Sequence, residues 1–231
     1  MPTQAKADRN TLTRDTVVEA ALVTADGEGL KAVSFRRLAA DLGVTPMALY
    51  RYVSSKEELL AAMMDRVFGE FELPAETQGD WREQLRELGR SFRRLLVAHP
   101  AAASLYLARV EAIFVNGLRV VEVILRVLQR AGFSRQQAAL LEGTLERNVL
   151  ALVLLETGSA AAATPEEQAA RVRAQRARLL TLSPQEFPHV IAAADELTGA
   201  VDPDEAFEYA LDLVIAGLEK QLDASQQSSH H

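Results

Sequence analysis

The segment from residue 33 to residue 60 constrains this chain most, because three helix starts follow one another within it. A hydroxyl side chain at an N-cap accepts a hydrogen bond from a free backbone N–H of the first helical turn, and apolar residues commonly flank it. Ser34, Thr45 and Ser55 each stand in such a setting. Ser55 and Glu58 also fit a capping box, in which each side chain bonds the other residue's backbone N–H. The pattern predicts three short helices in close succession.

The connection between the first two of these helices is a tight turn. Gly43 can adopt the positive φ that a sharp helix-to-helix turn needs, and Ala39 is small enough to let the helices approach. Pro46 falls at the first position of the second helix, where a missing N–H costs nothing. The segment therefore predicts a helix-turn-helix unit, which in DNA-binding proteins lays its second helix in a DNA groove.

The helix predicted from Thr45 to Val53 has two different faces, because residues three and four apart share a side. Leu49 and Val53 point inward. The outward face suits base edges and phosphates better than water alone; it carries Thr45, Met47, Ala48, Arg51 and Tyr52. From residue 34 to residue 56 the charged residues are Arg36, Arg37, Arg51 and Lys56 against Asp41, which leaves an excess of three positive charges.

This segment resembles the tetracycline-repressor-like (TetR) transcriptional regulators. The resemblance rests on residues in a fixed order: Leu38-Ala39, Leu42-Gly43-Val44, Leu49-Tyr50, and Lys56 followed by Leu59. It implies that Arg36, Pro46, Met47, Ala48 and Arg51 lie near base edges, and that Ser34, Tyr50, Tyr52 and Lys56 lie at or near phosphates. Many members have His where this chain has Tyr52, and a phenol can still donate to a phosphate but does not titrate near neutral pH.

Composition narrows the class of protein. The chain has 231 residues, 48% of them hydrophobic, and no cysteine, which excludes disulfides and cysteine nucleophiles. No stretch is apolar enough to span a bilayer and the N-terminal residues are too polar for a signal peptide, so we expect a cytoplasmic protein without membrane contact. Residues 1–60 carry eight charges of each sign, so the whole net charge of −7 arises beyond them. That acidity should orient the basic end toward DNA.

Helical periodicity continues to the end of the chain and no segment alternates with period two, so the fold class predicted is all-α. Residues 1–60 form the predicted helix-turn-helix DNA-binding domain, with a first helix from Thr13 to Asp26-Gly27. A connecting helix spans 55–72, residues 73–224 form a helical effector-binding and dimerisation domain, and residues 225–231 form a disordered tail. Helices are expected at 81–98, after Pro100, and at 115–130, 135–156, 165–181, 185–197 and 203–222, with Gly132 and Gly158 as helix ends.

Two of these helices are apolar almost all the way round, at residues 149–155 and 209–218. Such helices must be covered on two sides. Homodimerisation through both helices, forming an intermolecular four-helix bundle as the resemblance also implies, is the preferred interpretation. The alternative is that both are central core helices of one chain.

Several aromatic and polar residues fall in the helices that surround a small-molecule cavity in the resembled family. Polar side chains inside an apolar helix need a partner, which a ligand, water or another helix can supply. The candidate ligand residues are Phe92, Leu96, His99, Tyr106, Phe114, Asn116, Glu146 and Asn148. His99 and His189 lack neighbours at ligand spacing, so no metal site is predicted. The arginines between 171 and 178 fit a solvated helix better than an anion site.

These observations lead to one main hypothesis and one alternative. The main hypothesis is a homodimeric DNA-binding repressor that leaves a palindromic operator when a small-molecule effector binds its C-terminal domain. In the alternative, that domain binds a protein partner instead. An enzyme would need a nucleophile with a base, or a metal cluster, and neither is visible. We therefore expect no catalysis and no cofactor.

Overall fold

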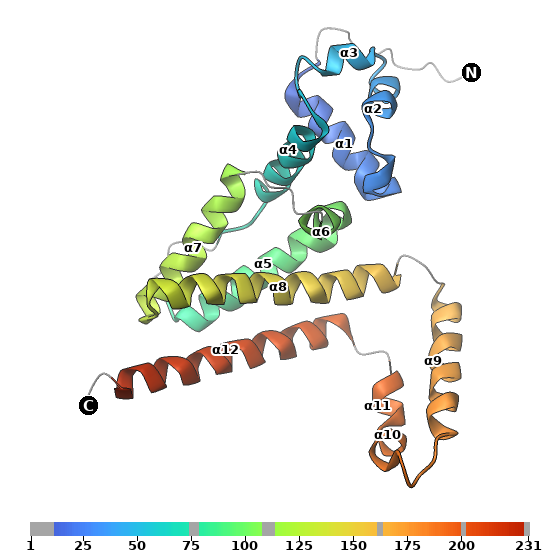
Figure 1. Ribbon diagram of the computed structural model, residues 1–231, viewed down its shortest axis with the longest axis vertical. Helices are drawn as coiled ribbons and strands as arrows, with labels where there is room; N and C mark the ends of the chain where they lie inside the picture. The colour runs from blue at the N-terminus through green and yellow to red at the C-terminus, as the bar shows by residue number, and fades with distance from the viewer. Residues whose placement is uncertain (1–11, 74–78, 108–113, 161–163, 200–201, 229–231) are drawn as a thin grey trace. The chain divides into compact units, whose positions relative to one another are not determined.

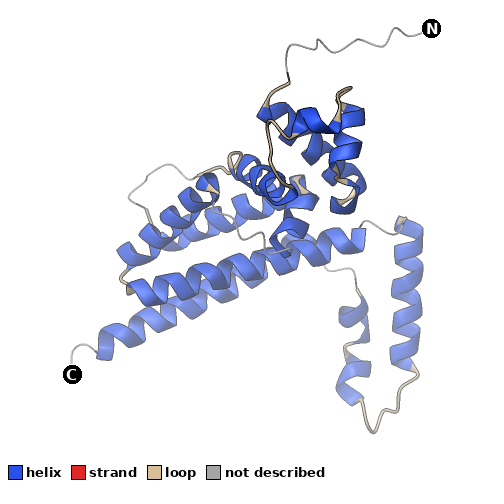
Figure 2. Ribbon diagram, turned by 45° about the horizontal axis from the view of Figure 1, so that its top comes forward, coloured by secondary structure: helices blue, strands red, loops and turns tan. Residues whose placement is uncertain are grey.

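A computed structural model describes residues 12–73, 79–107, 114–160, 164–199 and 202–228. Over these ranges the ordered elements are helices and no strand occurs, which confirms the all-α prediction (Figures 1 and 2). Within the same ranges, no helix combines the length and the apolar character needed to cross a membrane. The chain separates into two compact units, residues 1–153 and 154–231. The functional division at residues 60–73 stays a prediction.

The first helices of unit one follow the predicted caps. They are α1 (Arg14–Glu28), the short 3₁₀ helix η1 (Leu30–Ala32), α2 (Phe35–Asp41), α3 (Pro46–Leu49) and α4 (Lys56–Phe68). Thr13 caps α1 and Ser34 caps α2, as predicted. Gly43 has φ +67°, the left-handed conformation that the turn requires. The α1 helix passes the predicted stop at Gly27 and ends before Gly29, where φ is +85°.

The second helix of the helix-turn-helix unit is shorter than predicted. The α3 helix ends at Leu49, and residues 50–52 continue as a turn. The backbone N–H groups of Tyr52 and Val53 both donate to the Leu49 carbonyl, at 2.9 and 3.1 Å. The regular series of helical hydrogen bonds therefore ends at Leu49. Leu49 and Val53 are buried, with 0% and 1% of their surface exposed, which confirms their predicted inward position.

The start of α4 is capped by a variant of the predicted box. The Glu58 amide donates to Ser55 Oγ at 3.1 Å, as expected. The Glu58 carboxylate, however, accepts from the backbone N–H and the hydroxyl of Ser54, at 2.7 and 2.6 Å, and not from Ser55. Ser54 offers two donors to one carboxylate oxygen. These bonds lower the pKa of Glu58 below its ordinary value.

Four further helices complete unit one and surround the end of α4. They are α5 (Trp81–Ala98), α6 (Pro100–Leu107), α7 (Val115–Ala131) and the beginning of α8 (Arg135–Ala160). The α4 helix packs against α1, α6 and α7, and α5 packs against α6 and α7 (Figure 1). Gly132 ends α7 with φ +109°, as predicted. Gly158 does not end α8, because an interior glycine costs a helix only about 1 kcal/mol relative to alanine.

Unit two contains the end of α8 and the remaining helices α9 (Pro165–Leu180), α10 (Pro188–Ala192), α11 (Ala194–Thr198) and α12 (Pro203–Ser228). The single helix predicted at 185–197 is two short helices that meet at Ala193. The α12 helix runs to Ser228, so residues 225–228 are helical and not a disordered tail, because no Gly or Pro follows Leu222 to stop it. Arg176 of α9 pairs with Asp195 of α11, as in a solvated helix face.

We predict opposite effects from alanine at two glycines of the predicted DNA-binding domain. An added Cβ meets nothing within 4 Å at either Gly43 or Gly27, so only backbone conformation matters. Gly43→Ala should lower the free energy of unfolding by about 1–2 kcal/mol, because an L-residue is strained at positive φ. Gly27→Ala, within helical α1, should leave it unchanged or raise it by up to about 1 kcal/mol. Urea denaturation of both variants measures this, and a loss of equal size at both positions would contradict the assignment of the turn.

Candidate DNA interface and ligand cavity

The ten residues predicted to contact DNA lie together on α2, α3, the turn after α3 and the start of α4. Met47, at 73% exposed, and Tyr50, at 47%, are unusually open for large apolar and aromatic residues. The exposed members are Ser34, Arg36, Thr45, Pro46, Met47, Tyr50, Arg51 and Lys56, and the half-buried ones are Ala48 and Tyr52. The surface therefore offers the apolar, hydroxyl and cationic groups that contact base edges and phosphates.

The cations on this surface divide into one paired arginine and three available groups. Arg37 is held by two carboxylates, with its Nη2 at 2.7 Å from Glu28 Oε1 and its Nε at 2.8 Å from Asp41 Oδ2. Among the described residues, Arg36, Arg51 and Lys56 form no ion pair, and these three represent the excess of positive charge that the sequence predicted. A phosphate backbone can meet them without first breaking an ion pair.

Two side chains of the surface are fixed by neighbours in ways that preserve their polar ends. The Tyr50 ring stacks on Phe35, with centroids 4.5 Å apart and planes 1° from parallel, which ties the end of α3 to the start of α2. Ser34 Oγ accepts from the Arg37 amide at 3.2 Å. Both hydroxyl groups keep a proton to donate to a phosphate oxygen.

A cavity of about 340 Å³ lies where α4 ends, lined by residues from α4 to α8 within unit one. Phe92, Tyr106, Phe114 and Glu146, which the sequence nominated, line it. Most of the wall is apolar; the described lining also includes Phe68, Phe71, Leu85, Leu88, Gly89, Gly117, Leu118, Val120, Val121, Ile124, Glu142, Leu145 and Val149.

Phe68, the last residue of α4, lies in a cluster of rings at this wall. Its centroid is 5.4 Å from that of Phe114, 5.9 Å from Tyr106 and 6.1 Å from Phe92. A Cβ at Gly117 would stand 2.2 Å from the Phe114 ring, so only glycine lets that ring occupy its place. Sequence reasoning missed Phe68, Gly117 and the lining residues Phe71 and Glu142, although Glu142 and Glu146 show helical i, i+4 spacing.

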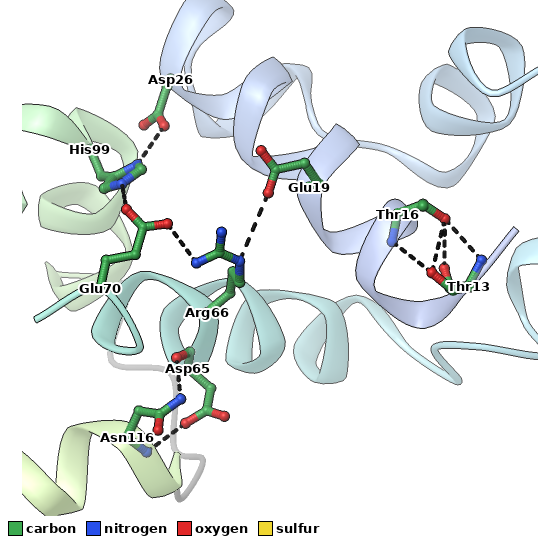
Figure 3. Close-up of polar contacts among 9 residues, drawn as sticks. All are labelled: Thr13, Thr16, Glu19, Asp26, Asp65, Arg66, Glu70, His99 and Asn116. Atoms are coloured by element: carbon green, nitrogen blue, oxygen red, sulfur yellow. Dashed lines mark hydrogen bonds and ion pairs between the residues drawn. The ribbon is translucent and has the colours of Figure 1, made fainter. Parts of the chain in front are cut away.

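The other four nominated ligand residues do not line this cavity. Leu96 is fully buried in the core. Asn148 is exposed and donates to the Thr144 carbonyl of its own helix at 2.8 Å. Asn116 joins α7 to α4. Its backbone N–H donates to Asp65 Oδ1 at 2.8 Å, and its side-chain Nδ2 donates to the Asp65 backbone carbonyl at 2.9 Å (Figure 3).

His99 lies instead in a polar cluster where α1, α5 and the segment after α4 meet (Figure 3). Its Nδ1 is 3.0 Å from Asp26 Oδ2, and its Nε2 is 3.1 Å from Glu70 Oε2. Asp26 also accepts from the Ala101 amide, and Glu70 pairs with Arg66. Burial lowers the pKa of His99, but bonds and charges from Asp26 and Glu70 outweigh it and raise this pKa overall. The bond from His99 lowers the pKa of Glu70. We call His99, Asp26, Glu70 and Arg66 the His99 cluster.

The polar part of the cavity wall is formed by α8 and α6. Glu142 and Glu146 are both half-buried, one helical turn apart. Burial and the charge of Glu146 raise the pKa of Glu142, against the opposing charge of Arg147. Burial and the nearby negative charge of Glu146 raise the pKa of Tyr106. Across the described part of the chain, no group of His, Cys, Asp and Glu side chains has the geometry to hold a metal ion.

Comparison with known proteins gives matches over both parts of the chain. The model for bacterial regulatory proteins of the tetR family matches residues 17–63, and the model for the tetracyclin repressor-like C-terminal domain matches residues 73–222. The HTH-type transcriptional repressor DrrR1 of Streptomyces coeruleorubidus is 48% identical over 96 residues, which are 41% of this chain and 36% of that protein. The chain thus matches about a third of DrrR1.

Two full-length matches extend the likeness. The class C tetracycline repressor protein of Escherichia coli is 30% identical over 91% of this chain and 92% of its own length. The crystal structure of apo ActR from Streptomyces coelicolor has a TM-score of 0.83 and 31% identity, covering 94% of this chain and 100% of that one. ActR has also been crystallised in complex with actinorhodin.

We predict that the His99 cluster makes stability depend on pH. Because the folded pKa of His99 is raised, its contribution is complete below the unfolded value of about 6.5 and is lost as pH rises through the folded value. His99→Gln should lower the free energy of unfolding by about 1–2 kcal/mol at pH 5.5, and by progressively less toward pH 8.5. Denaturation across this range measures the difference. His189→Gln, at an exposed histidine, is the control. A His99→Gln deficit that grows with pH would contradict the prediction.

Proposed function

The chain belongs to the tetR family of bacterial regulatory proteins, and on this premise we propose that it is a homodimeric transcriptional repressor that a small-molecule effector releases from a palindromic DNA operator. DrrR1 is named as a repressor, which supports repression here. ActR has been crystallised in complex with actinorhodin, which supports a small-molecule effector for this chain.

One observation carries the proposal: the two ends of α4 belong to the two candidate sites. Lys56 begins the helix on the DNA-binding surface, and Phe68 ends it at the cavity wall. Thirteen helical residues span roughly 20 Å as one rigid rod. An effector that binds better to one position of Phe68 therefore favours one position of the DNA-binding helices, and only this difference in affinity shifts the equilibrium.

The cavity favours a small molecule over a protein partner as the effector. Its volume of about 340 Å³ falls within the range of ligand pockets, and its wall is apolar with few polar groups. A protein partner would instead need a broad accessible surface.

Exposed apolar faces support homodimerisation. Leu155 of α8 is 72% exposed, and on α12 Tyr209 and Leu213 are 68% and 58% exposed. Ala216 and Gly217 continue the same face of α12, and Gly217 leaves space for close approach of a second backbone. A two-fold dimer would carry two recognition helices about 34 Å apart, matching successive major grooves.

We predict that the purified protein selects palindromic DNA from a random pool, with half-site centres about 10 base pairs apart or a multiple of this. Arg36→Ala should relax preference at one base position by roughly 1–3 kcal/mol, whereas Lys56→Ala should weaken all sequences alike and reduce the salt dependence. Sequencing the selected DNA and titrating both variants measure this. Selection of unrelated sequences without symmetry, or equal losses on operator and random DNA for both variants, would refute the proposal.

We predict that charge on the exposed face of α12 weakens the dimer. Leu213→Arg should reduce dimer affinity by at least about 10-fold, because an unpaired charge would enter an apolar interface. Leu180→Arg on α9 is the matched control, since Leu180 is also an exposed leucine, at 45%. Sedimentation velocity over a range of concentrations measures the equilibrium. An undiminished dimer in Leu213→Arg would exclude this face of α12 from the interface.

A further inference from the structure

The wall of the cavity has an uneven distribution of charge. Its described lining residues are glycines and hydrocarbon side chains except for Tyr106, Glu142 and Glu146. None of these described lining residues is Lys, Arg or His. Both ionisable acids of this lining therefore come from one helix, α8.

One of the two carboxylates, that of Glu142, lies in an environment that disfavours its negative charge. Glu142 and Glu146 are one turn apart on the same helix face and are both half-buried. The charge of Arg147 lowers the pKa of Glu142, but burial and the charge of Glu146 outweigh it. Arg147 is exposed and does not line the cavity. A carboxylate facing apolar surroundings is costly unless a positive charge or hydrogen-bond donors pair with it. Tyr106 is the other polar residue of the lining.

The aromatic part of the cavity wall suits flat rings and cations. Phe68, Phe71, Phe92, Phe114 and Tyr106 line it, and their neighbouring centroids lie 5.4–6.5 Å apart. Aromatic ligands gain from offset or edge-to-face contact with such rings. The ring faces also attract cations, most strongly where water is excluded.

We propose that the ligand class of this cavity is an aromatic cation, whose rings pack among the phenylalanines and whose protonated amine pairs with Glu142 and Glu146. This inference rests on the proposed function of the cavity as the effector site and adds the charge of the effector. An anion of the same shape would face two carboxylates in a region of low dielectric constant. A neutral ligand would cover those carboxylates without supplying a counter-charge.

Three anthracenes that differ only in one substituent test the proposal on the full-length protein. They are 9-(aminomethyl)anthracene, a cation at pH 7, 9-anthracenemethanol, which is neutral, and 9-anthracenecarboxylate, an anion. Fluorescence titration measures the dissociation constant of each. The cation should bind at least about 10-fold more tightly than the alcohol, and the carboxylate should bind most weakly.

Conservative variants assign the preference to particular residues. Glu142→Gln and Glu146→Gln keep the size of each side chain and should each weaken the cation by about 10-fold, while the alcohol changes by less than about two-fold. Glu122→Gln, on the exposed face of α7 and outside this cavity, removes the same charge and should change neither affinity. Melting temperatures of the ligand-free variants establish that each is folded.

Each outcome decides between the inference and the function on which it rests. Equal affinity for the cation and the alcohol, no binding of any anthracene, or insensitivity to both glutamine variants would overturn the inference. Cation binding that leaves DNA affinity unchanged would support the charge preference but refute release from the operator. DNA release by the neutral alcohol, with no advantage for the cation, would support the function and refute the charge preference.

Discussion

The packing of Phe68 among four other aromatic rings is the interaction on which the rest of unit one depends. Phe68 is 5% exposed, and it is at once the final residue of α4 and part of the cavity wall. Each favourable ring pair contributes about 0.5–1.5 kcal/mol beyond burial, so the ring leaves its position only if its neighbours repack. Because close-packed cores adopt discrete arrangements, an effector in the cavity would, on the proposed function, share these contacts with α4.

Directional polar contacts hold α4 from two further sides and limit how it can move. The His99 cluster joins the segment after α4 to α1 and α5, and Asp65 receives both donors of Asn116 from α7. Hydrogen bonds that involve charged groups contribute about 1.5–3 kcal/mol each, and they weaken steeply with angle and distance. A rotation of α4 must therefore exchange these bonds for others or for water. The difference in effector affinity between the two arrangements has to exceed that cost.

The caps and most helices could be predicted because they depend on residues close together in the sequence. Contacts between segments far apart in the sequence could not be predicted. Ser34 predicts a helix start because the backbone N–H that bonds its hydroxyl oxygen, that of Arg37, lies within the first turn. The cavity brings together Phe68 of α4, Phe114 at the start of α7 and Glu142 of α8. The periodicity within each helix does not predict which helices pack together. Asn148 does not line the cavity, and its side chain donates to a backbone carbonyl of its own helix, a partner that the sequence pattern does not reveal. The shorter α3 reflects the shared Leu49 carbonyl, which helical periodicity does not reveal.

The division of charge along the chain connects the two candidate sites. Residues 1–60 are electrically balanced, and pairing of Arg37 with Glu28 and Asp41 leaves Arg36, Arg51 and Lys56, among the described residues, without an ion pair on the candidate DNA interface. The net charge of −7 arises entirely beyond residue 60, where Glu142 and Glu146 line the cavity. An acidic C-terminal part repels the phosphate backbone and raises the local concentration of cations. On the proposed function, the same negative charge would orient the protein on DNA and would favour positively charged ligands at the end of α4.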